Sequence, residues 1–401
     1  MKYIVILGDG MADEPLQALE NRTPLEYANT PCMDALAGMG QMGRAKTVPD
    51  GMKPGSDVAN LAVMGYNPAK SYSGRSPLEA LSVGAPMEEG DVIFRCNLVT
   101  VSEEEACYSD KTIIDHSAGE ISTEDAAILM DAIRKAFNRE DLHFYNGTSY
   151  RHITVWKGGQ VLDMAQPHDH LGEKIAQYLP EHPEFRQMME ESFQILNEHP
   201  INRERAKKGL NKANSLWFWG AGTKPSLENF QEKTGLSGAV ISAVDLLKGI
   251  ALGAGMTAID VPGANGSLHT NYEGKAQAAV DALLKQGKDY VYVHVEAPDE
   301  MGHQGSIEKK IKAIEALDSR VIQPIFQQME ASQEPYRMLI MPDHPTPIRL
   351  RTHTADPVPY ILFDSQKRRK SMEHYTEKAA AATGVYQPEG WRLLEQLIEK
   401  A

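Results

Sequence analysis

The chain has 401 residues, 42% of them hydrophobic, and this length predicts two or three domains with sizeable cores. Its formal net charge of −14 offers no basic surface to nucleic acid or to an acidic membrane. Residues 3–7 form too short an apolar run for a signal peptide, and no run approaches the ~20 residues that cross a bilayer. Three cysteines without CxxC spacing are typical of a reducing compartment. We therefore expect a cytoplasmic protein that binds neither nucleic acid nor membrane; the sequence indicates no oligomeric state.

Apolar, β-branched or aromatic runs that stop at Gly, Pro or Asp predict short buried strands. In chain order these runs are residues 3–7, 215–219, 257–261, 290–295, 337–341 and 359–363. Helical patterns lie between several of them, at residues 236–252, 274–286 and 307–331. Because strands and helices alternate, we expect an α/β fold whose parallel sheet is covered by helices on both faces.

Residues 90–183 have a different character. The runs VIFRCNLVTV and HFYNGTSYRHITVWKG predict strands of a smaller α+β unit. We expect this unit to be inserted into a discontinuous domain formed by residues 1–89 and 184–401. The polar stretch 197–214 predicts a helix and a linker that returns the chain to the larger domain.

Three carboxylates each follow a predicted strand. Asp9 comes after residues 3–7, Asp299 after 290–295 and Asp343 after 337–341. The carboxyl ends of parallel strands meet at one edge of a sheet, where ligands bind. Each residue alone has a structural explanation, since Asp suits turns and the first turn of a helix. A shared site at this edge explains all three together.

Histidines accompany two of these carboxylates. A helix would place Asp299 and His303, four residues apart, on one face. His344 and His353 lie in the segment PDHPTPIRLRTH after the strand at 337–341, where they could also be ordinary loop residues. Carboxylate and imidazole groups in this number are suited to two divalent cations, which points to phosphoryl transfer.

Ser56, in the segment PGSDVAN, is the candidate nucleophile. Coordination to a divalent cation would lower the pKa of its hydroxyl. The turn Pro54-Gly55 before it and the apolar run after it predict a helix whose first amides could receive a phosphate. A plain N-cap serine is the alternative, and the two roles are compatible.

Two nucleotide-binding motifs fail. The chain has no GxxxxGK[ST] segment, so a phosphate-binding P-loop is not expected. The glycines in residues 253–258 follow a helical pattern and precede a strand, the reverse of the dinucleotide-binding order. We interpret this segment as a loop.

Motifs along nearly the whole chain resemble the cofactor-independent (2,3-bisphosphoglycerate-independent) phosphoglycerate mutases of the archaeal type, in the alkaline phosphatase superfamily. The segments are GDGMADEP, PGSDVANLAVMGYNP, SGRSPLEA, FRCNLVTV, SYRHITVW, PDEMGH, PDHPTPIRLRTH and HTADPVPYILF. The resemblance implies an alkaline-phosphatase-like α/β sandwich with two Mn²⁺ or Zn²⁺ ions and a smaller inserted phosphotransferase domain that caps them. One ion would be held by Asp9, Ser56, Asp343 and His344, the other by Asp299, His303 and His353.

By the same resemblance, Ser56 would carry the phosphoryl group between 3-phosphoglycerate and 2-phosphoglycerate, a small phosphorylated hydroxy acid. Arginines suit its carboxylate, because they pair with carboxylates in a bidentate manner. Surface ion pairs are the alternative role for these arginines. The substrate-binding candidates in matching or neighbouring motifs are Arg75, Arg95, Arg151, Asp115, His116, Lys224 and Lys248.

One segment departs from the family pattern. Archaeal mutases have arginines where this chain has His116, Ser117 and Glu120. Fewer cations weaken the case for a doubly anionic substrate, since a buried anion needs compensating charge. A phosphotransferase acting on homoserine or a related hydroxy acid is therefore an alternative, and a non-enzymatic metal-binding protein is a third.

Overall fold

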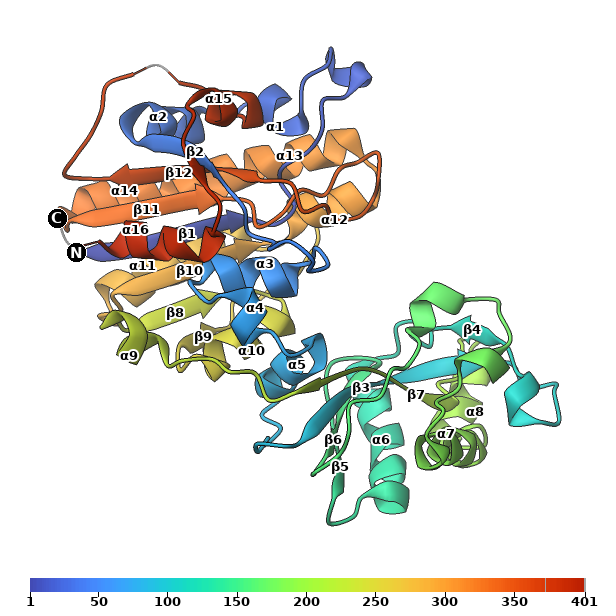
Figure 1. Ribbon diagram of the computed structural model, residues 1–401. Coiled ribbons are helices and arrows are strands. Elements are labelled where there is room, and N and C mark those ends of the chain that lie inside the picture. The colour runs from blue at the N-terminus through green and yellow to red at the C-terminus, as the bar shows by residue number, and fades with distance from the viewer. Residues whose placement is uncertain (372, 400–401) are drawn as a thin grey trace. The chain divides into compact units, whose positions relative to one another are not determined.

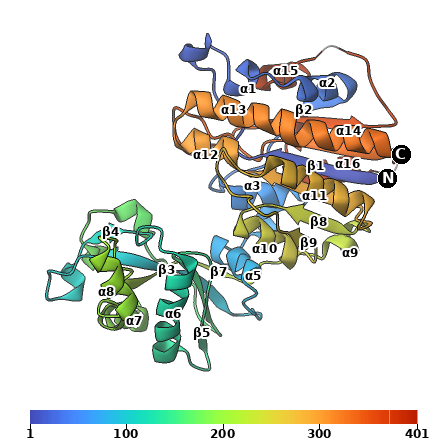
Figure 2. The same cartoon turned by 180° about the vertical axis from the view of Figure 1, so that it is seen from behind.

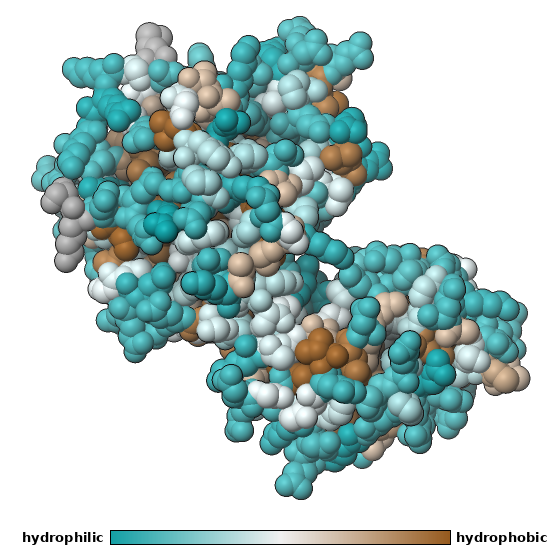
Figure 3. Space-filling model, in the orientation of Figure 1, coloured by the Kyte–Doolittle hydropathy of each residue, from teal (hydrophilic) through white to brown (hydrophobic). Residues whose placement is uncertain are grey.

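The computed structural model describes residues 1–371 and 373–399, which form two compact units (Figure 1). The larger unit comprises Met1–Tyr72 and Ser226–Ala401, and the inserted unit comprises Ser73–Pro225. Among the described residues, no helix is both long and apolar enough to span a membrane. The face drawn in Figure 3 is mainly hydrophilic and carries only separate hydrophobic patches.

An eight-stranded sheet runs through the larger unit. Its strands, in spatial order, are β13 (Tyr386–Gln387), β2 (Gln41–Ala45), β12 (Val358–Asp364), β11 (Tyr336–Met341), β1 (Lys2–Gly8), β10 (Tyr290–Val295), β8 (Gly238–Ile241) and β9 (Thr257–Ile259). From β11 to β9 all neighbours are parallel, whereas β12 is antiparallel to both of its neighbours. The sheet is thus mainly parallel, as predicted.

Helices cover both faces of this sheet. One face carries α1 (Pro24–Tyr27), α2 (Pro31–Met39), α11 (Tyr272–Leu284), α13 (Ile307–Leu317) and α14 (Gln323–Ser332), seen from behind in Figure 2. The other carries α3 (Ser56–Val63), α10 (Asp245–Gly253) and α16 (Leu393–Ile398). Short helices complete the unit: α4 (Pro68–Ser71), α9 (Phe230–Thr234), α12 (Ala297–His303) and α15 (Glu377–Ala382).

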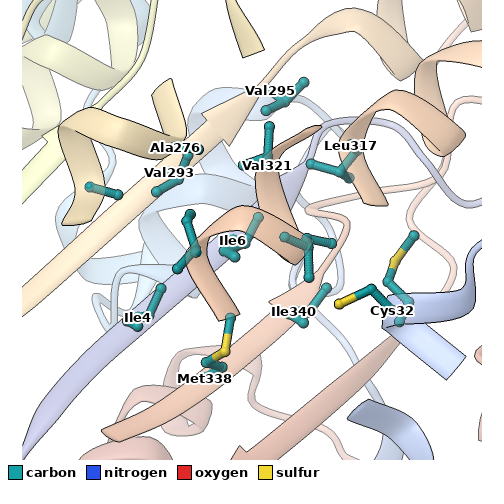
Figure 4. Packing of buried hydrophobic residues seen from close by; sticks show 14 of the residues in the cluster. Ile4, Ile6, Cys32, Ala276, Val293, Val295, Leu317, Val321, Met338 and Ile340 are labelled. Atoms are coloured by element: carbon teal, nitrogen blue, oxygen red, sulfur yellow. The ribbon is translucent and has the colours of Figure 1, made fainter. Parts of the chain in front are cut away.

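The main core lies between the sheet and the α11–α14 layer. Ile4 and Ile6 of β1 pack with Val293 of β10 and Ile340 of β11, beneath Leu317 at the end of α13 (Figure 4). All five side chains are fully buried, and each such burial stabilises the fold by roughly 1.5–3 kcal/mol. This core fixes the central strands whose ends carry the predicted ligands.

Two predicted helices differ from the structure. The pattern at 236–252 contains strand β8 followed by α10, because a short buried apolar run does not distinguish a strand from a helix. The pattern at 307–331 is α13, a π-helical turn at Asp318–Ile322, and α14. Pro324 has no N–H to donate and therefore interrupts the regular helical ladder near this turn. The Asp318 carboxylate accepts the backbone N–H groups of Cys32 and Met33 at the start of α2.

The inserted unit contains an antiparallel sheet. Strands follow the order β4 (Ile113–Asp115), β3 (Val92–Val101), β6 (Arg151–Trp156) and β5 (Leu142–Tyr145), and β7 (Ser215–Thr223) also pairs with β3. Its helices are α5 (Arg75–Ser82), α6 (Thr123–Phe137), α7 (Pro183–Leu196) and α8 (Pro200–Lys207).

This unit is longer than the predicted insert of 90–183. Strand β7, which the sequence assigned to the large parallel sheet, pairs antiparallel with β3 from Val92↔Thr223 to Val99↔Ser215. The expected linker at 197–214 contains α8 and packs inside the unit, where Asn202 and Asn214 are fully buried. Apolar periodicity does not reveal which of two sheets a strand joins. The predicted C-terminal boundary at residue 183 was too early for that reason, because β7 belongs to the inserted unit.

Candidate metal centre

Three neighbouring parallel strands bring the predicted carboxylates to one sheet edge. Asp9 follows β1 directly, Asp343 lies two residues after β11, and Asp299 lies in α12 just after β10. All three are buried, with exposed fractions of 3%, 0% and 8% for Asp9, Asp343 and Asp299. The three residues thus follow adjacent strands of one sheet, as expected from their places after the predicted strands.

The first ligand group consists of Asp9, Asp343 and His344, whose ligand atoms lie within 4.8 Å of one another. The Nε2 atom of His344 is 3.5 Å from Asp9 Oδ1 and 3.3 Å from Asp343 Oδ2. Ser56 lies beside this group, with its Oγ 3.1 Å from His344 Nε2 and 3.4 Å from Asp9 Oδ2. The structure thus brings the four residues of the first predicted ligand set together.

The second ligand group consists of Asp299, His344 and His353, again with ligand atoms within 4.8 Å. His303 adjoins it, since its Nε2 is 3.2 Å from Asp299 Oδ2 and 3.0 Å from His353 Nε2. The predicted set of Asp299, His303 and His353 is therefore assembled. His344 belongs to both groups, which the sequence did not indicate.

The electrostatics of these groups fit divalent cations. Burial, reinforced by the Asp343 and Asp299 carboxylates, raises the pKa of Asp9 well above its usual value. Asp9 Oδ1 is buried and accepts no hydrogen bond from any described residue. Clustered buried carboxylates with an unsatisfied oxygen are costly unless a cation compensates them. Their arrangement is therefore suited to hold metal.

The histidines differ in their titration. Burial lowers the pKa of His344, which favours the neutral imidazole that can coordinate a cation. The hydrogen bond to Asp299 raises the pKa of His303 to about 9, although burial opposes it. Burial also raises the pKa of Asp299, but hydrogen bonds with His303 and His353 outweigh burial and hold it well below its usual value. His303 and Asp299 thus share a hydrogen bond whose proton a bound cation could replace.

Ser56 is the first residue of α3, and Gly55 is the N-cap. The alternative of a plain N-cap serine was wrong, because the Ser56 hydroxyl lies against Asp9 and His344 instead of capping the helix. Asn60, one turn later, donates from Nδ2 to Ser56 O and to Asp343 Oδ2, at 2.8 Å each. This amide ties the start of α3 to the end of β11.

Sequence reasoning did not identify Asn60, although its position four residues after Ser56 places it on the same helix face. It also missed Thr346, whose hydroxyl donates to Asp299 Oδ1 and lies 3.3 Å from His344 Nδ1. Gly10 has a φ of +59°, and a Cβ there would lie 2.4 Å from Thr346 Oγ1. A side chain at position 10 is therefore excluded by both backbone conformation and space.

A buried lysine anchors the loop that carries His344. Lys310 of α13 donates to Asp13 Oδ2 and to Thr346 O, at 2.8 Å each. Asp13 in turn accepts the backbone N–H of Ile348. Burial lowers the pKa of the Lys310 ammonium, and Asp13 opposes this effect. The loop after β11 is thus bound to the segment after β1.

The predicted arginines form a separate cluster in the inserted unit. Arg75 Nε and Arg95 Nη2 each donate to Glu79 Oε1 at 2.9 Å. Burial raises the pKa of Glu79, but Arg95 and Arg75 outweigh burial and hold it below its usual value. Arg151 also lowers the pKa of Glu79 through its charge. Three arginines thus surround this one carboxylate.

Arg95 is the most buried member of this arginine cluster, at 8% exposure. Its guanidinium lies 4.7 Å from the ring centroid of Trp219, and its Nε donates to no described residue. A surface ion pair therefore does not describe Arg95. The rings of His116 and His168 lie 6.0 Å apart, and His168 lies 5.3 Å from Trp219. Nothing in the sequence distinguished His168 from other histidines.

Two of the other candidates, Asp115 and Lys248, are engaged elsewhere. Asp115 accepts the backbone N–H groups of Ser117 and Gly119 at 2.8 and 2.7 Å, so it organises its own turn. Lys248 lies in α10 and pairs with Asp260 at 2.6 Å. Lys224 is an exposed residue just after β7. All three stay predictions as substrate contacts.

Comparisons with known proteins agree with the motifs. A family model described as 2,3-bisphosphoglycerate-independent phosphoglycerate mutase matches residues 37–202. A protein of that name from Methanosarcina acetivorans is 48% identical over 96% of each chain. A protein named as a probable member from Geobacter sulfurreducens is 47% identical over 100% of each.

Two solved structures are similar over nearly the whole chain. A Pyrococcus horikoshii protein superposes with a TM-score of 0.81 at 29% identity, covering 99% of this chain and 96% of that one. The cofactor-independent phosphoglycerate mutase of Thermoplasma acidophilum gives a TM-score of 0.66 at 27% identity, covering 100% and 99%. The chain belongs to the family of 2,3-bisphosphoglycerate-independent phosphoglycerate mutases.

Proposed function

We propose that the protein interconverts 3-phosphoglycerate and 2-phosphoglycerate through a phosphoserine at Ser56. The observation that carries this proposal is the Ser56 hydroxyl, 3.1 Å from His344 and 3.4 Å from Asp9, at the first turn of α3. A helix N-terminus favours phosphate oxygens there. No other serine in the motifs has these surroundings.

Two divalent cations, Mn²⁺ or Zn²⁺, complete the proposed site. Asp9, Ser56, Asp343 and His344 would hold one, and Asp299, His303 and His353 the other. Bound cations would lower the pKa of the Ser56 hydroxyl and neutralise the phosphoryl oxygens. The short distances within each ligand group and the unsatisfied Asp9 Oδ1 support this assignment.

Phosphoryl transfer then takes two in-line displacements. Ser56 Oγ gives up its proton and attacks phosphorus, the bond from phosphorus to the glycerate oxygen breaks, and that oxygen takes up a proton. The other glycerate hydroxyl next gives up its proton and attacks the phosphoserine, the bond from phosphorus to Ser56 Oγ breaks, and Oγ takes up a proton. Asn60 holds the Ser56 backbone during both steps through its hydrogen bond to Ser56 O.

Recognition of the carboxylate falls to the arginine cluster. Arg75, Arg95 and Arg151 supply the positive charge, and the unpaired Nε of Arg95 is available to an anion. Charge-assisted hydrogen bonds of this kind are worth about 1.5–3 kcal/mol each. We therefore propose that these three arginines, which lie in the family motifs, hold the substrate carboxylate.

The test is an assay of Mn²⁺-loaded protein for interconversion of the two phosphoglycerates, with Ser56→Ala alongside. We expect activity in the wild type and its loss in the variant. Ser319→Ala is the matched control, because Ser319 is an exposed helical serine whose hydroxyl donates to Glu315 O in its own turn. A wild type without interconversion would overturn the proposal.

Homoserine phosphorylation is assayed with the same samples. His116 motivates this second assay, because its ring lies beside that of His168, which in turn lies beside Trp219 of the arginine cluster. Formation of phosphohomoserine without phosphoglycerate turnover would select that alternative. Absence of both activities from the wild type and from Ser56→Ala would instead favour a non-enzymatic metal-binding protein.

A further inference from the structure

We infer that His294 is a positioning residue that orients the Asp9 carboxylate for metal binding. This inference rests on the proposed function, because it concerns the same cations. His294 lies in β10, directly beside Leu7 of β1 in the sheet register. Its Nε2 is 2.9 Å from Asp9 Oδ2. A carboxylate only accepts hydrogen bonds, so Nε2 is the donor when Asp9 is ionised.

The two Asp9 oxygens have different surroundings. Oδ2 accepts from His294, whereas Oδ1 is buried, accepts no bond from a described residue and is 3.5 Å from His344 Nε2. Fixing Oδ2 also fixes the direction of Oδ1, because the carboxylate is planar. His294 thereby leaves Oδ1 directed to the first ligand group.

A buried chain of polar side chains holds the imidazole in turn. His294 Nδ1 is 3.1 Å from Ser242 Oγ and 3.5 Å from Glu296 Oε1. Lys275 Nζ lies 2.9 Å from Glu296 Oε2 and donates to His294 O at 2.8 Å. The exposed fractions of Lys275, His294, Ser242 and Glu296 are 0%, 0%, 3% and 4%. The ring has little freedom to turn about χ2.

Core packing alone does not explain this buried network of polar side chains. Replacing a buried ion pair by apolar residues of similar volume is often neutral or stabilising, so stability alone does not explain Lys275 and Glu296. Their chain ends at a carboxylate of the first ligand group. Residues that orient metal ligands typically change metal affinity 10- to 100-fold when replaced. Metal affinity is therefore the property that His294 should control.

Two amide variants of His294 distinguish the effect of its hydrogen bond to Asp9 from the effect of losing side-chain volume. In His294→Gln the side-chain amide reaches the place of Nε2 and can donate to Asp9, whereas in His294→Asn it reaches only the place of Nδ1. We measure Mn²⁺ affinity by competition with a chelator, and thermal unfolding of the metal-free proteins. We expect His294→Gln to stay within about threefold of wild type and His294→Asn to bind at least about tenfold more weakly.

His152→Asn is the matched control. His152 is equally buried, at 1% exposure, but lies in β6 of the inserted unit. We expect it to lower thermal stability without changing Mn²⁺ affinity. Equal Mn²⁺ affinities of His294→Asn, His294→Gln and the wild type would overturn the positioning role and leave the proposed function intact. A wild type that binds no Mn²⁺ would overturn both.

Discussion

The candidate metal centre is built from buried and half-buried residues, whereas the arginine cluster ranges from the buried Arg95 to the exposed Arg75. The two regions are also assembled by different means. The metal centre gathers carboxylates that follow three adjacent parallel strands, β11, β1 and β10. The arginine cluster gathers cations from α5, β3 and β6, around one carboxylate on α5. Parallel strand ends collect residues through topology alone. An antiparallel sheet does so only through register and side-chain reach.

The two regions should therefore respond differently to mutation. Loss of a metal-centre carboxylate should reduce metal binding and turnover together. Loss of an arginine should weaken binding of the substrate and leave metal binding unchanged. The following changes test this division in order of expected effect.

Asp343→Asn should have the largest effect. Asp343 is fully buried and accepts from the backbone of Gly10 and His344 and from Asn60, so the isosteric amide removes charge with little change of shape. We expect kcat to fall by about 10³-fold, with weaker Mn²⁺ binding. Metal content and steady-state kinetics measure both quantities. Asp50→Asn, at an exposed ion pair, should change neither.

Arg95→Met should raise KM for 3-phosphoglycerate by about 10- to 100-fold, since a charge-assisted hydrogen bond is worth roughly 1.5–3 kcal/mol. Methionine retains apolar volume against Trp219. Bound Mn²⁺ should be unchanged. Arg203→Met, at an exposed pair with Glu198, is the control. A loss of Mn²⁺ in Arg95→Met would break the proposed division between the two regions.

Asn60→Ala should lower kcat by about tenfold and leave KM nearly unchanged. The variant loses the bonds to Ser56 O and Asp343 Oδ2 and leaves the Tyr292 hydroxyl without its acceptor. Unsatisfied buried groups cost about 1–3 kcal/mol. Asn67→Ala removes a helix cap on α4 and should reduce stability without lowering kcat. Equal kcat effects in both variants would show that Asn60 has no special role.

Glu377→Gln should have the smallest effect, on stability alone. Burial raises the pKa of Glu377 to about 7, although Thr23, the Asp13 amide and Lys310 oppose it. In the unfolded chain the pKa of this carboxyl is near its ordinary value of 4.5, so the folded state holds an extra proton between about pH 4.5 and about pH 7. Stability should therefore fall by about 1–3 kcal/mol as pH rises through this window.

Urea unfolding at several pH values measures how the free energy of unfolding changes with pH. Glu377→Gln should flatten this dependence, whereas Glu198→Gln at the surface should not. A slope that is identical in Glu377→Gln and wild type would show that another group titrates there.

The sequence predicted most residues of the candidate metal centre and few of the residues that hold them in place. Asp9, Asp299 and Asp343 were found because each follows an apolar strand. His294 lies inside β10, where it reads as an ordinary core position, and Lys310 lies within a regular amphipathic helix. Their partners, Asp9 and Asp13, are distant in sequence. Local patterns carry no information on such long-range pairs.

The inserted unit was harder to predict for the same reason. Its strands were recognised, but β7 was assigned to the wrong sheet, because pairing with β3 depends on register and not on composition. Arg75, Arg95 and Arg151 were named through family motifs. Their arrangement around Glu79, and the approach of His168 to Trp219, required the structure.

The Lys310 anchor affects how a cation would bind. Opening the loop that carries His344 would break the bonds of Lys310 to Asp13 and Thr346 and those of Asp13 to Ile348 together. Fixing a flexible residue costs about 1–2 kcal/mol of conformational entropy. Because folding of the larger unit already orders this loop, binding energy of a cation is not consumed in ordering it.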